Sequence, residues 1–299
     1  MKRTRASTRN QNSENKDSNK IDLVKDNKMV SQKNSKKGTS NRVNKNVTKN
    51  FNDLKFMEEE LQQLEDPPST PWEIKISTSK LLYSFYNNPC EKLAQNILGK
   101  ILVRKLDDGT ILKGKIVETE SYLGIIDKAS ATYQGKVTPR NIPMYMKPGT
   151  IFVYVTYGMY HCFNISSQGE GSSVFLRAVE PLEGIEQMKY HRNSKSNSKV
   201  PKKSNKNFKL HELCNGPSKL CIAFDINKDH TKYSMCSWKG MWLEDDPQKQ
   251  DYKIISCPRI GIDSAGTEWA SKPLRYYIFE NESVSKRDKK AEEMVNISK

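Results

Sequence analysis

The chain has 299 residues, of which 35% are hydrophobic and 28% are charged, and its formal net charge is +15. No apolar run approaches the roughly 20 residues of a membrane-spanning helix, and no apolar stretch follows the basic start, so we expect neither an integral membrane protein nor a secretory signal. Six cysteines without a Cys-x-x-Cys pair exclude a disulfide scaffold and an ordinary zinc ribbon.

The positive charge is concentrated in two polar stretches. Residues 1–50 hold 14 Lys and Arg against 4 Asp and Glu, and residues 189–209 hold 8 Lys and Arg with no acid, so the rest of the chain is close to neutral. Nucleic acid is the commonest partner of such basic segments, although the same composition can simply keep a disordered segment in solution. We expect a disordered basic tail over residues 1–76 and a basic surface insertion at about 189–209.

After the tail, hydrophobic periodicity predicts one α+β domain over residues 77–285, which the basic insertion interrupts, followed by a C-terminal tail over 286–299. The turn sequence Asp107-Asp108-Gly109-Thr110 between two strand patterns predicts a hairpin, so the core should be a curved, largely antiparallel sheet flanked by helices. The predicted helices cover residues 56–64, 89–98 and 181–188, and the predicted strands cover residues 100–106, 111–119, 151–157, 161–166, 173–178 and 274–279.

The first candidate site is a pair of acids near the end of a predicted strand. If the strand continues beyond residue 119, alternation places Glu118, Glu120 and Tyr122 on one side of it. Acids at such a position usually face solvent. A carboxylate near a buried site can instead act as a general base on water, which is chemistry that suits the hydrolysis of a glycosidic bond.

The second candidate site is aromatic. Residues 154–161 contain four rings, which normally indicates core packing, but Tyr157 precedes Gly158 and is predicted to lie on an exposed turn. Exposed aromatic side chains stack on nucleobases or wedge between them. Asn164 and Arg177 lie on neighbouring predicted strands, where they could read a base edge or stabilise charge, or simply be satisfied by the backbone.

No metal or nucleotide-cofactor motif is evident. The four histidines lack paired ligands at fixed spacing, and the sequence has no glycine-rich phosphate loop. A predicted helix start at Ser218-Lys219 could hold a phosphate, or it could be an ordinary capped helix. We therefore expect no metal and no cofactor.

Eight motifs, dispersed in order over about residues 80–280, carry a family resemblance. They read GKIVETESYLG from Gly114, TPRN from Thr138, MKPGT from Met146, VYVTYGMY from Val153, NISSQG from Asn164, LRAVEPLEG from Leu176, ELCNGPSKLC from Glu212 and KPLR from Lys272. With these motifs the chain resembles the alkyladenine DNA glycosylases, which are also called 3-methyladenine or N-methylpurine DNA glycosylases.

The resemblance implies a monofunctional hydrolase of N-glycosyl bonds that uses no metal, cofactor or lyase step. Such an enzyme flips alkylated purines (3-methyladenine, 7-methylguanine) or deaminated purines out of double-stranded DNA and removes them, which starts base excision repair. The expected protein is a monomer that acts in the nucleus without a membrane. By position, the resemblance implies that Glu120 is the general base, that Arg177 is its partner near the attacking water, and that the backbone of Ile262 helps to hold this water. It also implies that Tyr157 inserts into the duplex. Tyr122 and Tyr154 would form aromatic walls around the flipped base, and Asn164 would exclude guanine.

One departure from the family pattern affects the expected pocket. The family reads approximately Asp-x-Ala-Ser/Ala-His, whereas this chain reads DKASA from Asp127, so that Ala131 stands where the family has a base-contacting histidine. We therefore expect a looser pocket that favours cationic alkylpurines over neutral hypoxanthine or ethenoadenine. The alternatives are a catalytically weak protein of the same fold that only binds damaged DNA, and an RNA-binding or chromatin-associated protein whose basic tail does the main work.

Overall fold

The structure of the protein is a computed structural model that describes residues 49–50, 61–66, 70–71, 79–194, 206–248 and 250–297. All of these residues belong to one compact unit, residues 45–299. The expected disordered tail and the expected helix over 56–64 lie mostly outside the described residues. The helices are α3 (Tyr83–Tyr86), α4 (Cys90–Asn96), α5 (Ile185–Ser194), α6 (Pro217–Ala223), α7 (Thr267–Ser271) and α8 (Lys289–Ile297).

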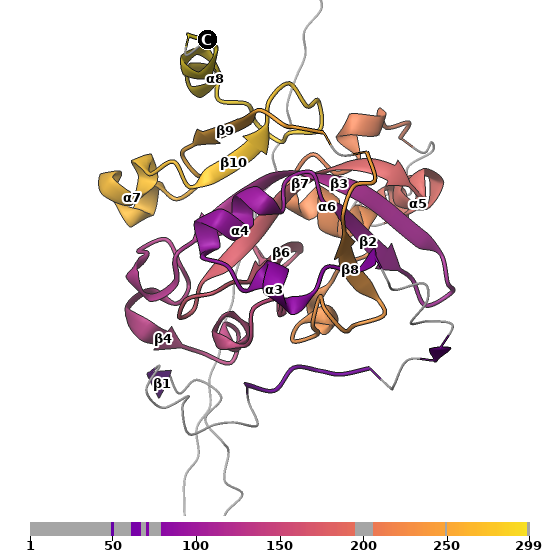
Figure 1. Ribbon diagram of the computed structural model, residues 1–299, viewed down its shortest axis with the longest axis horizontal. Helices are drawn as coiled ribbons and strands as arrows, with labels where there is room; N and C mark the ends of the chain where they lie inside the picture. The colour runs from indigo at the N-terminus through magenta and orange to yellow at the C-terminus, as the bar shows by residue number, and fades with distance from the viewer. Residues whose placement is uncertain are drawn as a thin grey trace, which may run out of the picture. The chain divides into compact units, whose positions relative to one another are not determined.

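An antiparallel sheet of eight strands forms the centre of the fold, with helices around it (Figure 1). This arrangement confirms the predicted α+β class. The strands are β2 (Ile101–Lys105), β3 (Ile111–Tyr122), β5 (Ile151–Thr156), β6 (Tyr160–Ser166), β7 (Ser173–Glu183), β8 (Met241–Glu244), β9 (Ile254–Cys257) and β10 (Arg275–Ile278); a separate two-stranded sheet joins β1 (Lys49–Asn50) to β4 (Lys136–Val137).

Strand β3 is the long central strand of the sheet. It pairs with β7 along one edge; along its other edge, its first half pairs with β2 and its second half pairs with β10. The β2–β3 pair is the hairpin that the turn at residues 107–110 predicts. Because β3 has neighbours on both edges, side chains near its end can contact three different parts of the chain.

Helix α4 lies over β3 and β7 on one face of the sheet (Figure 1). It begins directly after Pro89 and is followed by Gly99, as the sequence predicts. Gly99 has φ +82°, and a Cβ there would lie 2.4 Å from the ring of Tyr252, so glycine is required at this turn. The hydroxyl of Thr119 donates a hydrogen bond to the carbonyl of Ala94 at 2.8 Å, which fixes α4 against β3.

The helix predicted over residues 181–188 is partly wrong. Residues 181–183 extend β7, because Pro181 and Glu183 pair with Gly114 and Lys113 of β3. Gly184 then adopts φ +78°, and α5 begins one residue later and continues to Ser194. The first residues of the expected basic insertion are therefore helical, and residues 195–205 lie outside the described part of the chain.

Short segments near both ends of the chain pack on the same unit. The side chain of Gln63 donates to the hydroxyl of Thr150 at 2.7 Å, and the carboxylate of Asp66 accepts from the backbone N–H of Lys239 at 2.6 Å. The expected C-terminal tail contains α8, whose Glu292 pairs with Arg287 at 2.7 Å. The expected domain boundaries at 76 and 285 stay predictions.

His230 makes the stability of the fold depend on pH. Burial and the neighbouring Arg104 guanidinium, 3.2 Å from Nε2, lower the pKa of His230 to about 4. Between pH 6.5 and about 4 the unfolded chain is protonated at this residue and the folded protein is not, so stability falls as the pH falls through this window. Between pH 7 and pH 5 we expect the wild type to lose about 1 kcal/mol more unfolding free energy than His230→Gln in urea titrations. Equal losses would contradict this prediction.

Candidate active site

Two buried carboxylates define the site. Glu118 and Glu120 have no solvent exposure and lie on the same side of β3, as alternation predicts, while Thr119 points to the opposite face and contacts α4. An ionised carboxylate in a protein interior requires donors or cations around it. The surroundings of the two side chains supply both.

Arg177 bridges the two carboxylates because of an irregularity in the sheet. In the ladder between β3 and β7, Glu118 faces Ala178 and Thr119 faces Leu176, so Arg177 falls in a bulge. Its Nε lies 3.2 Å from Glu118 Oε1, and its Nη1 lies 3.2 Å from Glu120 Oε1. Burial opposes the charge of Arg177, but Glu120 and Glu118 together raise its pKa, so it stays a cation.

Glu120 is held by two further donors. The hydroxyl of Tyr122 donates to Oε2 at 3.0 Å, and the backbone N–H of Ile260 donates to Oε1 at 2.9 Å. The structure thus brings the backbone of Ile260 to the carboxylate. The carbonyl of Ile262 accepts the N–H of Ala265 at 2.9 Å, within a local turn, and its expected role of holding the attacking water stays a prediction.

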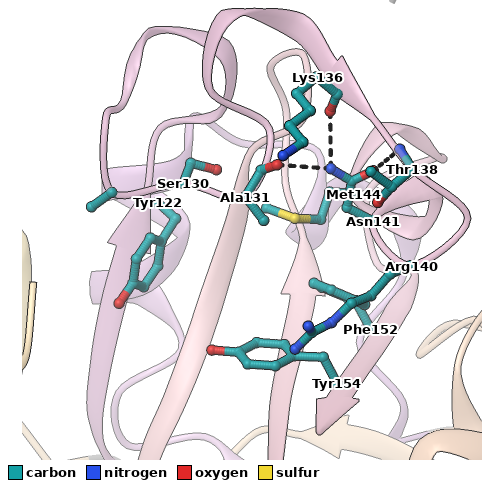
Figure 2. A pocket seen from close by; sticks show the side chains of 11 residues that line it. Tyr122, Ser130, Ala131, Lys136, Thr138, Arg140, Asn141, Met144, Phe152 and Tyr154 are labelled. Carbon is teal, nitrogen blue, oxygen red and sulfur yellow. Dashed lines mark hydrogen bonds between the residues drawn. The ribbon is translucent and has the colours of Figure 1, made fainter. Parts of the chain in front are cut away.

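A cavity of about 440 Å³ opens beside this cluster. The rings of Tyr122 and Tyr154 enter it from different strands (Figure 2), and the hydroxyl of Tyr122 links it to Glu120. Burial raises the pKa of both phenols, so they remain neutral. The side chains that line the cavity are Tyr122, Ala129, Ser130, Ala131, Lys136, Thr138, Arg140, Asn141, Met144, Phe152 and Tyr154.

The wall that contains Ala131 is tied together by one amide side chain. Asn141 donates to the carbonyls of Ala131 and Lys136 at 2.8 and 2.9 Å, and it accepts from the N–H of Thr138 at 2.7 Å (Figure 2). Asn141 is buried, so these bonds are protected from water. The alanine at 131 therefore leaves space in a wall whose backbone is well fixed.

Asn164 lies next to the cavity and is not one of its lining residues. Its side-chain amide donates to the carbonyls of Phe152 and Cys162, both at 3.3 Å. Phe152 lies directly opposite it on β5 and does line the cavity. Asn164 thus supports the strand that carries Phe152 and Tyr154.

A buried ion pair that the sequence analysis missed packs against the ring of Tyr122. Arg259 makes two bonds to Asp127, at 2.6 and 3.0 Å, and both side chains are fully buried. The guanidinium of Arg259 lies 4.6 Å from the centre of the Tyr122 ring. Asp127 also accepts the backbone N–H groups of Leu123 and Ala129, so the pair fixes both a ring and a loop of the cavity. The available sequence signal was an arginine in the apolar run around Ile260.

Tyr157 lies on an exposed turn, as the residue before Gly158 was predicted to do. Its side chain is 86% exposed, and its φ of +50° lies in the left-handed region, which costs a residue with a Cβ on the order of 1–3 kcal/mol. Gly158 follows with φ +71°, and the N–H of Met159 closes the turn on the carbonyl of Thr156 at 3.2 Å. Strain of this kind around an unpacked ring is typical of functional positions.

From the sequence, metal and membrane features are expected to be absent. Within the described ranges, no group of three or more His, Cys, Asp or Glu side chains could hold a metal ion. The helix start at Ser218-Lys219, which the sequence offered as a possible phosphate site, belongs to α6. This helix begins at Pro217 and has only seven residues, and the side chain of Lys219 donates to that of Asn215 at 2.7 Å. None of the helices in the described part of the chain has the length and apolar character of a membrane span.

The fold and the site together define a class of protein: an antiparallel-sheet domain with a cavity that two tyrosines line, one of them hydrogen-bonded to a buried carboxylate. The model of the methylpurine-DNA glycosylase (MPG) family matches residues 84–282 of the chain. The chain belongs to this family, which confirms the resemblance seen in the sequence.

Several curated relatives show the same relationship. Proteins named DNA-3-methyladenine glycosylase are 48% identical over 212 residues in Mus musculus and 44% identical over 236 residues in Homo sapiens. These matches cover 70% and 76% of this chain, and 62% and 78% of the relatives. A putative 3-methyladenine DNA glycosylase of Clostridium tetani is 46% identical over 211 residues, which are 70% of this chain and 100% of that protein. The match thus spans less than two thirds of the mouse protein.

Proposed function

We propose that the protein is a monofunctional DNA glycosylase that removes alkylated or deaminated purines from double-stranded DNA and so starts base excision repair. One observation carries this proposal: the buried carboxylate of Glu120 is hydrogen-bonded to a tyrosine that lines a cavity large enough for a purine. The names of the relatives agree with it. The expected monomeric state and nuclear location are part of the proposal.

The hydrogen bonds of Glu120 indicate where the attacking water would bind. Oε1 accepts the N–H of Ile260 and lies 3.2 Å from Nη1 of Arg177, with which it forms an ion pair. In the described part of the chain Tyr122 is the only donor to Oε2, so this oxygen keeps one acceptor position. A water bound there would donate to Oε2 and present its oxygen to a sugar carbon in the cavity.

The reaction requires the nucleotide to leave the stack. Extrusion costs a few kcal/mol and is easiest for a damaged base. In the proposal Tyr157 fills the space in the duplex, and Tyr122 and Tyr154 stack on the extruded purine. The C1′–N9 bond then breaks with its electron pair passing to the purine; the water oxygen bonds to C1′, and Glu120 accepts the water proton. The carboxylate also stabilises the positive sugar that forms in the transition state.

The identity of residue 131 leads to a prediction about substrates. Without a ring at Ala131, the pocket holds a neutral purine less firmly, whereas a cationic purine is already activated for departure. In single-turnover assays on matched duplexes we expect 3-methyladenine to be released at least about 10-fold faster than hypoxanthine, as one lost hydrogen bond or ring contact would give. Ala131→His should narrow this ratio by increasing the release of hypoxanthine.

The same panel of lesions tests the proposed function itself. Release of no damaged purine by the wild type would overturn the proposed activity. Faster release of hypoxanthine than of 3-methyladenine would overturn only the substrate preference.

A further inference from the structure

Glu118, the second buried carboxylate on β3, has no role in the proposed reaction. Its two oxygens accept from Arg177 Nε at 3.2 Å, from Arg275 Nη1 at 2.9 Å and from the backbone N–H of Ser285 at 2.7 Å. It is fully buried and comes from the same strand as Glu120, two residues earlier. A side chain so fully paired requires a structural or a functional reason.

Arg177 is the link between the two carboxylates. A guanidinium is planar and rigid, so partners on two of its nitrogens fix its rotation. Glu118 holds Nε, Glu120 contacts Nη1, and Nη2 lies 3.5 Å from the hydroxyl of Ser285. Each nitrogen of the rigid guanidinium thus has its own partner. If Glu118 released Nε, the whole plane could turn, and Nη1 would lose its position against Glu120.

Arg275 extends this connection to the C-terminal segment. Its Nη1 contacts Glu118 and also donates to the carbonyl of Lys286 at 2.6 Å, while its Nε donates to the carbonyl of Pro258 at 2.9 Å. Two carboxylates and two guanidiniums then form a cluster without net charge. A change in either Glu118 or Arg275 would therefore leave a net charge close to Glu120.

We propose that Glu118 is a positioning residue, which holds Arg177 against Glu120 and balances the charge of Arg177, so that the carboxylate of Glu120 is fixed where it can activate water. Arg275 and the backbone of Ser285 hold Glu118 in turn. This inference rests on the proposed function of Glu120.

The groups around the two carboxylates allow pH to report on this arrangement. They are Tyr122 on β3, Tyr154 on β5, Cys162 on β6, Arg177 on β7, Cys257 on β9 and Arg275 on β10. Burial raises the pKa of the tyrosines and of both thiols, that of Cys257 to about 12, so none of them ionises between pH 4 and 8. A change of rate with pH in that range would thus not arise from these tyrosines or thiols.

The test compares Glu118→Gln with Arg275→Gln in the full chain. Single-turnover release of 7-methylguanine from duplex DNA is measured from pH 4 to 8, because this cationic base departs without being protonated. Glu118→Gln leaves an extra positive charge that favours the ionised form of Glu120. The acid midpoint, which is the pH below neutrality at which the rate is half its maximum, should therefore fall by about one pH unit. The maximum rate should fall roughly 3- to 10-fold. Arg275→Gln leaves an extra negative charge, so the midpoint should rise by about one unit.

A control separates positioning from stability. Glu292→Gln makes the same chemical change at a buried carboxylate on α8 that pairs with Arg287 and Tyr277 and not with either acid of the site. It should leave the midpoint unchanged even if it lowers the melting temperature as much as Glu118→Gln does. Midpoints that stay fixed in the Glu118 and Arg275 variants, or that move in the same direction, would overturn the positioning role. Full activity of Glu120→Gln would instead overturn the general-base role of Glu120 on which this inference rests, and release of no damaged purine by the wild type would overturn the proposed function.

Discussion

Glu120→Gln is expected to lower the single-turnover rate of purine release from alkylated duplex DNA by about 10²- to 10⁴-fold, the usual contribution of a general base. The substitution keeps the size of the side chain. Its amide oxygen can still accept from Arg177 and the N–H of Ile260, and its NH₂ group can donate to the hydroxyl of Tyr122. The amide has no basic oxygen to accept the water proton, so chemistry should be lost while the fold remains.

Binding measurements show whether the loss is chemical. The variant should bind a duplex with a damaged purine within about threefold of the wild type, which is less than 1 kcal/mol, because the pocket walls are unchanged. Equal, slow release by wild type and variant would instead favour the alternative in which the protein binds damage and barely cleaves. A variant that has lost binding as well would show that Glu120 shapes the pocket.

Tyr157→Ser is expected to lower kcat/KM on duplex DNA by about 5- to 150-fold, which corresponds to the 1–3 kcal/mol of one lost stacking contact. The ring is 86% exposed, so its removal should change the free energy of unfolding by less than about 0.5 kcal/mol. On a damaged purine in single-stranded DNA, where no stack has to be opened, the loss should be much smaller.

Another exposed tyrosine provides the matched control for this substitution. Tyr190 on α5 is 64% exposed and does not line the cavity beside Glu120. Tyr190→Ser should leave release from duplex DNA within about twofold of the wild type, as expected for a surface change. A large loss of stability in Tyr157→Ser would mean that Tyr157 packs in the core, and equal losses on duplex and single-stranded DNA would contradict a role in opening the stack.

Local patterns in the sequence were sufficient for much of the sheet. Alternation and turn residues located the β2–β3 hairpin and placed Glu118, Glu120 and Tyr122 on one side of β3. The left-handed preference around Gly158 located the exposed turn of Tyr157. These features depend on neighbours within a few residues, which is why one sequence is enough to predict them.

Features that depend on pairing between distant strands could not be predicted. The bulge that places Arg177 between two carboxylates is a property of the β3–β7 register. A shift of this register by one residue would turn the side chain of Arg177 to the other face of the sheet. Asp127 and Arg259 lie 132 residues apart, and nothing in either segment predicts the other as its partner. The same limit applies to the backbone donor of Glu120, because the path of a loop brings the N–H of Ile260 to the carboxylate.

Strand β5 carries Tyr154 within its length, and Tyr157 follows in the turn at its end. The cavity wall and the projecting ring are therefore parts of one hydrogen-bonded ribbon, and their separation follows from covalent geometry instead of from the docking of two independent loops. A substitution that loosens the pairing of β5 with β6 would shift both rings together. The two proposed roles, stacking of Tyr154 on the base and insertion of Tyr157 into the duplex, would then decline together.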